Sequence, residues 1–217
     1  LSPSSAASDV YKRQLVAYLI WGLYPFYFHA MQHVAPTEIV IHRVLWTFAL
    51  LAVYLFCSRR WRWIQKAITD RRTVAVFLMS SVLITANWST YTYAIVTNQT
   101  LEASLGYFMN PLVSVLLGTV FLKEKLNKAQ MLAIVFACAG VMWVTFKQGE
   151  FPALGLTLAL SFGFYGLVRK MAPLGSLEGL TLETAFAFPV ALLATFYFAG
   201  NGDLTFCLLY TSPSPRD

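Results

Sequence analysis

Long apolar runs separated by short polar connections dominate the sequence. Seven runs are long enough, or nearly so, to cross a bilayer as helices, which takes about 20 residues. They lie at Leu15–Met31, Glu38–Phe56, Thr73–Ile95, Ala103–Leu122, Gln130–Phe146, Ala153–Val168 and Leu180–Ala199. The pattern therefore predicts an all-α protein, a polytopic membrane helical bundle with seven transmembrane helices.

Basic residues gather in every second connection between these runs. The basic connections are residues 58–72, with six Lys or Arg, residues 123–128, with three, and residues 169–170, with two. The alternate connections hold a single one, Lys147, and are residues 33–37, 96–100, 147–152 and 200–206. Cytoplasmic loops of membrane proteins carry the excess of Lys and Arg. The asymmetry predicts that the N-terminus and the basic connections are cytoplasmic.

Composition agrees with a membrane protein and excludes other classes. Hydrophobic residues make up 58% of the 217 residues and charged residues only 12%, about half the charged share of a soluble domain. The net charge of +6 does not indicate nucleic-acid binding, because the basic residues lie in the connections. Cys57, Cys138 and Cys207 have no metal-ligand or redox spacing. The sequence has no phosphate-loop, dinucleotide, zinc or hydrolase motif, so no cofactor is predicted.

Both ends of the chain are predicted to be foreign to the protein. Residues 9–14, Asp-Val-Tyr-Lys-Arg-Gln, can be encoded as GATGTGTATAAGAGACAG. The reverse complement of that DNA, shifted by one base, encodes Cys-Leu-Leu-Tyr-Thr-Ser, which is residues 207–212. Unrelated protein ends are rarely reverse complements, and these two resemble translated transposon adapters from a sequencing library. We therefore expect residues 1–14 and 207–217 to be non-native flanks that do not pack against the helices.

The fourth run is unusually polar at its start. Glu102, Ser104, Tyr107, Asn110 and Pro111 lie within one ten-residue segment. Each polar group must find a partner in the protein or line a wet cavity, because an unpaired group in hydrocarbon costs several kcal/mol. We expect Ser104, Tyr107, Met109, Asn110 and Pro111 to be mostly shielded from lipid, with Pro111 as a kink or hinge. Glu102 is either a first-turn carboxylate that the helix dipole favours or a gate or proton-coupling acid.

Five further residues are candidates for the same cavity: Trp21, Tyr24, Arg43, Asn87 and Tyr91. Arg43 either faces the cavity, to bind an anionic substrate or pair with an acid, or reaches the membrane interface along its apolar stem. Asn87 and Tyr91 are four residues apart, on one face of a helix, and Asn87 needs a polar partner. Trp21 and Tyr24 can stack on a flat substrate, although packing and interfacial belts use most such rings.

Part of the sequence is repeated. Residues 21–24, Trp-Gly-Leu-Tyr, match residues 162–165, Phe-Gly-Phe-Tyr. Two acidic or basic pairs also match at nearly the same offset, Glu38 with Glu178 and Arg43 with Glu183. A repeat of five helices inserts its second copy upside down, which is the inverted-repeat architecture of secondary transporters. We expect Arg43 and Glu183 to lie about one turn inside their helices and to line vestibules of opposite charge, periplasmic and cytoplasmic respectively.

The block from Leu101 to Phe108, Leu-Glu-Ala-Ser-Leu-Gly-Tyr-Phe, followed by Asn110-Pro111-Leu112, resembles the RarD-type branch of the EamA family. This family belongs to the drug/metabolite transporter superfamily, and Glu124, Gln130 and Gly140 match its wider Pro…Glu…Gln…Gly pattern. The resemblance covers essentially all of residues 15–206. It implies ten helices in two inverted five-helix repeats around a substrate cavity. Residues 15–150 would then be the first repeat, and residues 151–206 the first two helices of a truncated second repeat.

The function that the resemblance implies is secondary transport of small metabolites or drugs by alternating access, in the bacterial inner (plasma) membrane. The partners would be the lipid bilayer and an unidentified small-molecule substrate, with protons as a candidate coupling ion. With three helices missing, this fragment is not expected to transport. Two alternatives stay open: a non-transporting membrane scaffold, and an integral-membrane enzyme. An enzyme would need His, Asp or Glu clustered at one membrane level, and the fourth to sixth runs supply almost none.

Overall fold

The computed structural model describes residues 3–31, 34–59, 61–149 and 151–201, and the regular structure within them is helical. Eight helices follow one another along these residues: α1 (Pro3–Ala30), α2 (Pro36–Ser58), α3 (Arg62–Thr69), α4 (Arg71–Val96), α5 (Thr100–Phe121), α6 (Lys128–Gln148), α7 (Ala153–Lys170) and α8 (Ser176–Asn201). Every predicted apolar run is helical, so the all-α prediction is confirmed. The short helix α3 is an addition, in the basic connection where no helix was predicted.

Five helices of the described part of the chain are long and apolar enough to cross a membrane: α2, α4, α5, α6 and α8. This is fewer than the seven predicted. α7 has only 18 residues and ends in Arg169 and Lys170, so its apolar stretch is short. The second half of α1 carries Tyr, Pro and His side chains among its apolar ones, which lower its hydropathy.

The helix α1 begins at Pro3, well before the predicted start at Leu15. Residues 12–14, Lys-Arg-Gln, favour helix by intrinsic propensity, so the helix continues back through the predicted flank. Residues 10–14 are exposed. The other predicted flank, residues 207–217, lies outside the described residues.

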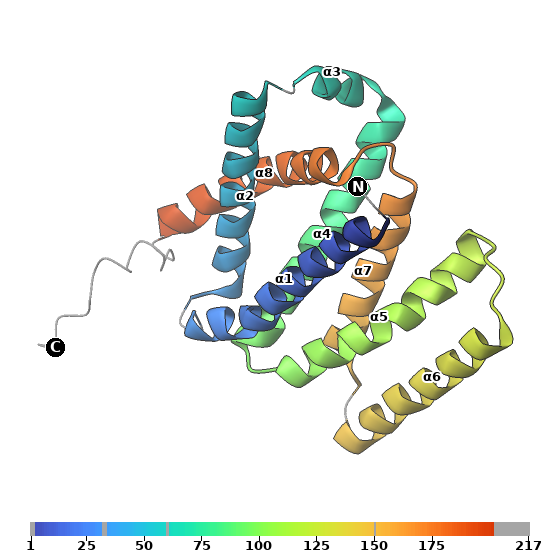
Figure 1. Cartoon of the computed structure of the whole chain (residues 1–217). Coiled ribbons are helices and arrows are strands. Elements are labelled where there is room, and N and C mark those ends of the chain that lie inside the picture. The colour runs from blue at the N-terminus through green and yellow to red at the C-terminus, as the bar shows by residue number, and fades with distance from the viewer. Residues whose placement is uncertain (1–2, 32–33, 60, 150, 202–217) are drawn as a thin grey trace, which may run out of the picture.

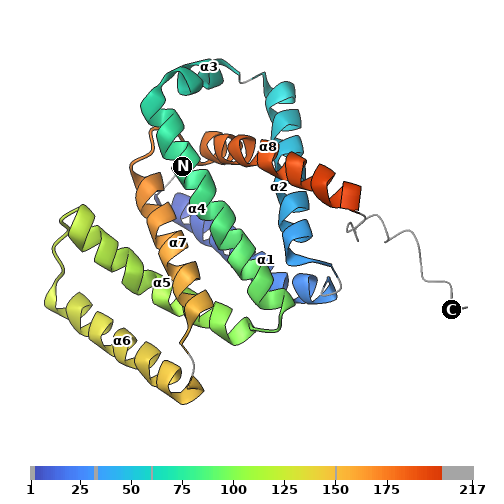
Figure 2. The same cartoon turned by 180° about the vertical axis from the view of Figure 1, so that it is seen from behind.

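The central helix of the bundle is α4. It packs against α1, α2, α3, α5, α7 and α8. In Figure 2, α2 and α8 lie to one side of it and α5 and α7 to the other, while α6 lies at the outer edge beside α5. Residues on several faces of α4 are therefore positioned to build sites with different neighbours.

Asp70 begins α4 as its N-cap residue. Its carboxylate accepts hydrogen bonds from the backbone N–H groups of Arg72 and Thr73, at 3.2 and 3.1 Å, and from the Thr73 hydroxyl at 2.6 Å. These bonds satisfy donors that have no partner inside the helix. They favour the charged form, the Thr73 hydroxyl most, and so lower the pKa of Asp70 below its ordinary value.

Two glycines allow α5 and α7 to approach closely. A Cβ atom added to Gly106 would lie 2.8 Å from the carbonyl oxygen of Gly155 and 2.9 Å from the Cβ of Leu158. Both distances are shorter than a van der Waals contact between non-bonded atoms. Any larger side chain at Gly106 would therefore push α5 and α7 apart. The packing of α5 on α7 joins residues 15–150 to residues 151–206, the two segments that were predicted to be different repeats.

Candidate functional site

Seven of the ten predicted cavity residues line one cavity of about 450 Å³. They are Trp21, Tyr24, Arg43, Asn87, Tyr91, Tyr107 and Asn110. Tyr18, Gly22, Trp88 and Phe162 complete the lining. The side chains come from α1, α2, α4, α5 and α7. We call this cavity the arginine pocket.

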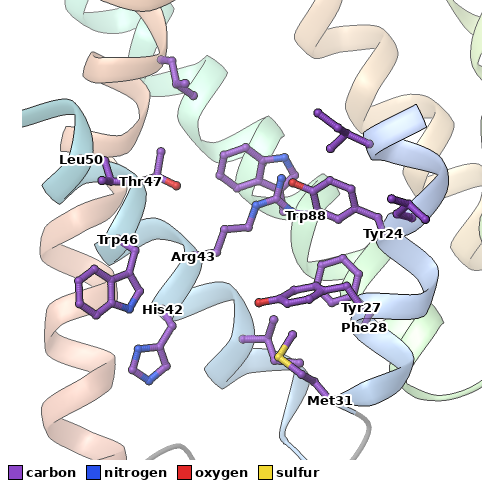
Figure 3. Close-up of a pocket in the computed structure, with 14 residues that line it drawn as sticks. Tyr24, Tyr27, Phe28, Met31, His42, Arg43, Trp46, Thr47, Leu50 and Trp88 are labelled. Carbon is purple, nitrogen blue, oxygen red and sulfur yellow. The ribbon is translucent and has the colours of Figure 1, made fainter. Parts of the chain in front are cut away.

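A second cavity, of about 680 Å³, adjoins the arginine pocket. Tyr24, Arg43 and Trp88 line both cavities. Figure 3 shows the Arg43 side chain reaching from α2 toward the rings of Trp88 and Tyr24, with His42 and Trp46 on another side of the same helix. Arg43 is thus accessible from two hollows in the bundle.

The contacts of Arg43 are aromatic. The guanidinium carbon lies 4.2 Å from the centroid of the Trp88 ring and 5.9 Å from that of Tyr24, the geometry of a cation–π interaction. The ion pairs within the described residues are His42–Glu38, Arg169–Glu183 and Lys170–Glu124. Arg43 belongs to none of them. The Arg43 side chain points into the bundle, as predicted by the first alternative, and within the described residues it contacts aromatic rings and forms no ion pair with an acid.

A chain of aromatic rings connects three helices at this cavity. Tyr24 contacts Phe28 at a centroid distance of 5.7 Å, Phe28 contacts Tyr91 at 5.9 Å, and Tyr91 contacts Tyr107 at 5.8 Å. The last two pairs meet edge to face, an arrangement that stabilises ring pairs beyond their buried area. The rings hold one wall of the arginine pocket across α1, α4 and α5.

Asn87 obtains its polar partner from α7. Its side-chain amide donates to the carbonyl of Leu158 and to the hydroxyl of Ser161, both at 3.1 Å, and the side chain is buried. These bonds link α4 to α7 beneath the pocket. Asn87 therefore stabilises the contact between α4 and α7 in addition to lining the pocket.

The sequence from residue 14 to residue 146 matches the EamA-like transporter family. The chain belongs to this family. It is 42% identical over 180 residues to the "Uncharacterized transporter YojE" of Bacillus subtilis, across 82% of this chain and 60% of that protein. It is 40% identical over 187 residues to "Protein RarD" of Escherichia coli, across 86% of this chain and 63% of that protein.

A further relative, "Protein RarD" of Streptomyces exfoliatus, is 35% identical over 190 residues, across 88% of this chain and 60% of that protein. The RarD-type resemblance is therefore confirmed, and the chain is a multi-pass membrane protein. It spans about 60% of the length of these curated relatives. No solved structure matches it.

Glu183 of this EamA-family chain lines neither cavity and is only 1% exposed. Its carboxylate accepts hydrogen bonds from the hydroxyls of Ser80 and, at 3.4 Å, Tyr165, and lies 3.7 Å from Nε of Arg169. We call Ser80, Tyr165, Arg169 and Glu183 the glutamate cluster. The cluster joins α4, α7 and α8. Glu183 was expected to line an open vestibule, but its side chain is buried and lines neither of the two cavities.

Arg43 and Glu183 hold the same place in their helices. Each is the eighth residue, counted from Pro36 in α2 and from Ser176 in α8. At about 3.6 residues per turn, both lie about two turns inside, deeper than the single turn predicted. The difference arises because both helices begin before their apolar runs.

The remaining predicted residues on α5 have structural contacts. Glu102 accepts a hydrogen bond at 3.2 Å from the backbone N–H of Leu154, in the first turn of α7, so it caps that helix. Ser104 is exposed and donates to the carbonyl of Thr100 at 2.9 Å. Its own helix therefore satisfies the hydroxyl, and the shielding of Ser104 from lipid stays a prediction for the full-length protein. Pro111 is exposed as well, and Tyr107, although it lines the pocket, is 50% exposed.

The sequence predictions missed several contributors, among them Trp88, Arg169 and Ser80. Trp88 follows Asn87, and consecutive helical side chains point about 100° apart. A prediction restricted to the helix face of Asn87 and Tyr91 therefore omits Trp88. The cavity is wide enough to include both Asn87 and Trp88. Arg169 was assigned to a cytoplasmic connection, yet it lies in the last turn of α7 and reaches Glu183. Ser80 gave no signal beyond being a small polar residue in an apolar run.

Proposed function

We propose that the full-length protein is a secondary transporter of small metabolites or drugs, and that the arginine pocket is its substrate site. The observation that carries this proposal is the convergence of seven polar or aromatic side chains from four helices on one cavity of about 450 Å³. Small-molecule sites have volumes of about 300–1,000 Å³ and combine apolar walls with a few polar groups. Membership of the EamA-like transporter family supports the same class of function.

The architecture in this proposal is two inverted five-helix repeats that alternate the access to the pocket. Residues 15–150 form the first repeat and residues 151–206 the start of the second, with α1 and α7 as the first helix of each. In support, α1 and α7 run in opposite directions in Figure 1. Tyr24 lies over Arg43 and its repeat partner Tyr165 bonds to Glu183, so matched residues are neighbours in both copies.

The orientation in this proposal places the N-terminus in the cytoplasm of a bacterium, below the inner membrane. In support, the basic connections after α2, α5 and α7 lie toward one end of the bundle in Figure 1, and the connections before α2, α5 and α7 toward the other. An exposed ion pair of 2.6 Å, Lys170 with Glu124, joins two of the basic connections. Labelling of single cysteines at Arg62 and Gln99 in intact cells would test this directly, with Gln99 alone accessible from outside.

The flanks are a separate part of the proposal. We infer that residues 1–14 and 207–217 are translated adapter sequence, because their possible coding sequences are reverse complements. The family match begins at residue 14, which supports this boundary. A genomic reading frame that encodes the same flanking residues would contradict the inference.

Transport by the full-length protein tests the function. The protein would be reconstituted in liposomes, and the flux of a panel of labelled small acids, amines and neutral metabolites measured with and without a proton gradient. Asn110→Phe fills the pocket and should abolish any protein-dependent flux. Leu116→Phe, at an exposed position of the same helix, is the matched control and should leave flux unchanged. No flux for any compound, or equal flux in Asn110→Phe, would contradict the proposal.

A further inference from the structure

Among the described residues, no acid forms an ion pair with Arg43, a cation at a cavity wall. The phenols of Tyr24, Tyr27, Tyr91 and Tyr107 lie near it, and His42 lines the larger cavity with it. Two acids of the neighbouring helices are engaged elsewhere, Glu102 at the start of α7 and Glu183 with Arg169. A charge in apolar surroundings is costly until a counter-charge reaches it. The pocket therefore favours a ligand that brings a negative charge.

The position of the Arg43 guanidinium relative to Trp88 also bears on the kind of ligand. The central carbon of the guanidinium lies over the Trp88 ring, 4.2 Å from the ring centroid. The N–H donors of a guanidinium lie in its plane and form a fork that matches the two oxygens of a carboxylate. Trp88 occupies one side of the guanidinium, and the two cavities that Arg43 lines leave space beside it for such a ligand. A carboxylate, with its planar pair of oxygens, matches this fork better than a spherical anion does.

The rest of the lining is suited to a flat apolar body. Trp21, Tyr91, Tyr107 and Phe162 contribute rings to the same cavity. Aromatic cages commonly bind cations through their ring faces. Here the cage already contains the cation Arg43, which repels a second positive charge, so the rings are left to stack on an uncharged ring of the ligand.

We propose that the arginine pocket binds small monoanions that combine a carboxylate with an aromatic ring. The carboxylate meets the edge of Arg43 and the ring lies among the aromatic side chains of the wall. The inference rests on the proposed function, since it names the substrate class of the same site. The volume of about 450 Å³ suits a metabolite of one or two rings, because it lies in the lower part of the usual range.

Binding of three matched probes to the purified full-length protein tests this class. Isothermal titration calorimetry would compare 2-naphthoate with the neutral 2-naphthamide and the cationic 2-naphthylmethylammonium, which share one ring system. We expect 2-naphthoate to bind at least about tenfold more tightly than the amide, and the ammonium probe not to bind. Arg43→Gln should remove the preference for the acid over the amide, and Arg43→Lys should retain part of it because the charge remains. Arg71→Gln, outside the pocket at the start of α4, is the control and should bind as wild type.

The outcomes separate this inference from the function on which it rests. If the amide or the ammonium probe binds as well as the acid, and Trp88→Leu weakens that binding, the pocket is a ligand site but the substrate class is wrong. If the acid binds equally well to wild type, Arg43→Gln and Trp88→Leu, the ligand lies elsewhere and both proposals fail. Size-exclusion profiles show which variants are folded, and Arg43→Lys keeps the test valid should Arg43→Gln misfold. A wild-type protein that binds none of the three probes contradicts the inference.

Discussion

Two charged residues at matched positions of the proposed repeat have opposite surroundings. Arg43 is half-buried, adjoins two cavities and stacks on Trp88 with no ion-pair partner among the described residues. Glu183 is buried and is held by Ser80, Tyr165 and Arg169. A charge that is already satisfied holds helices together, whereas a charge beside a cavity without a partner is available to a ligand. The comparison supports the proposal that the glutamate cluster stabilises the bundle and that the arginine pocket binds the ligand.

Side chains of the central helix α4 account for the different surroundings of Arg43 and Glu183. Toward Arg43 it presents Trp88, whose ring stacks but cannot neutralise a charge. Toward Glu183 it presents Ser80, whose hydroxyl donates to the carboxylate, and α7 adds Arg169. In the proposed repeat, the matched residues Arg43 and Glu183 therefore have different surroundings because α4 contacts the two copies with different side chains.

The largest effect on stability is expected at the glutamate cluster. Glu183→Ala leaves the Arg169 guanidinium without its acid, and breaking one side of a buried pair costs about 3–5 kcal/mol. The free energy of unfolding, measured for the full-length protein by titration with SDS in mixed micelles, should fall by this amount. Arg43→Gln in the same assay should change it by less than about 1 kcal/mol, because no ion pair is broken.

A double variant sharpens this test. Replacing both Glu183 and Arg169 by Leu removes both charges, and such replacements of buried pairs are often neutral. Glu183→Leu/Arg169→Leu should therefore be more stable than Glu183→Ala. Equal losses of stability in Arg43→Gln and Glu183→Ala would contradict the contrast between the two regions.

The next effect is expected where α5 meets α7. Gly106→Val places a side chain against Gly155 and Leu158, and overpacking of this kind costs about 1–3 kcal/mol. The unfolding assay should show this loss. Gly166→Val is the matched control, because a Cβ there meets nothing within 4 Å. A Gly106→Val protein as stable as its control would show that the two helices are not in close contact.

A smaller effect is expected at Asn87, which lies at the pocket but bonds to α7. Asn87→Ala removes the hydrogen bonds to Leu158 and Ser161 and should cost about 1 kcal/mol. Ser89→Ala, at an exposed position of the same helix, should cost less. If Asn87→Ala abolishes ligand binding while stability is unchanged, Asn87 belongs to recognition and not to the framework of the pocket.

The smallest effect is expected at Asp70, outside both regions. Because hydrogen bonds lower its pKa in the folded protein, its contribution to stability is present above the ordinary value of about 3.9 and is lost as pH falls through the folded value. Asp70→Ala should slightly lower the melting temperature at neutral pH, and the difference from wild type should vanish in acid. A difference that persists at the lowest pH would show that the charge of Asp70 has no part in the cap.

The sequence predicted the helices and most of the arginine pocket because both follow from the cost of polar groups in hydrocarbon. Arg43, Asn87, Tyr107 and Asn110 are expensive beside lipid, and the structure brings them to one cavity. The same argument did not anticipate that the helix of Ser104 supplies an acceptor for its hydroxyl one turn away. It also could not foresee the partners of Glu183 or the capping of α7 by Glu102. Those depend on which helices meet, and contacts between distant segments leave no local pattern.

The most direct test of the arginine pocket is the position of a heavy-atom ligand in the full-length protein. Crystals grown with 4-iodobenzoate would give an anomalous difference map that locates the iodine. We predict a peak in the space bounded by Trp88, Tyr91 and Tyr107, with the carboxylate toward Arg43, and no such peak in crystals of Arg43→Gln. A peak beside Arg169 and none in the arginine pocket, or the same peak in Arg43→Gln, would contradict the assignment of this pocket as the site of recognition.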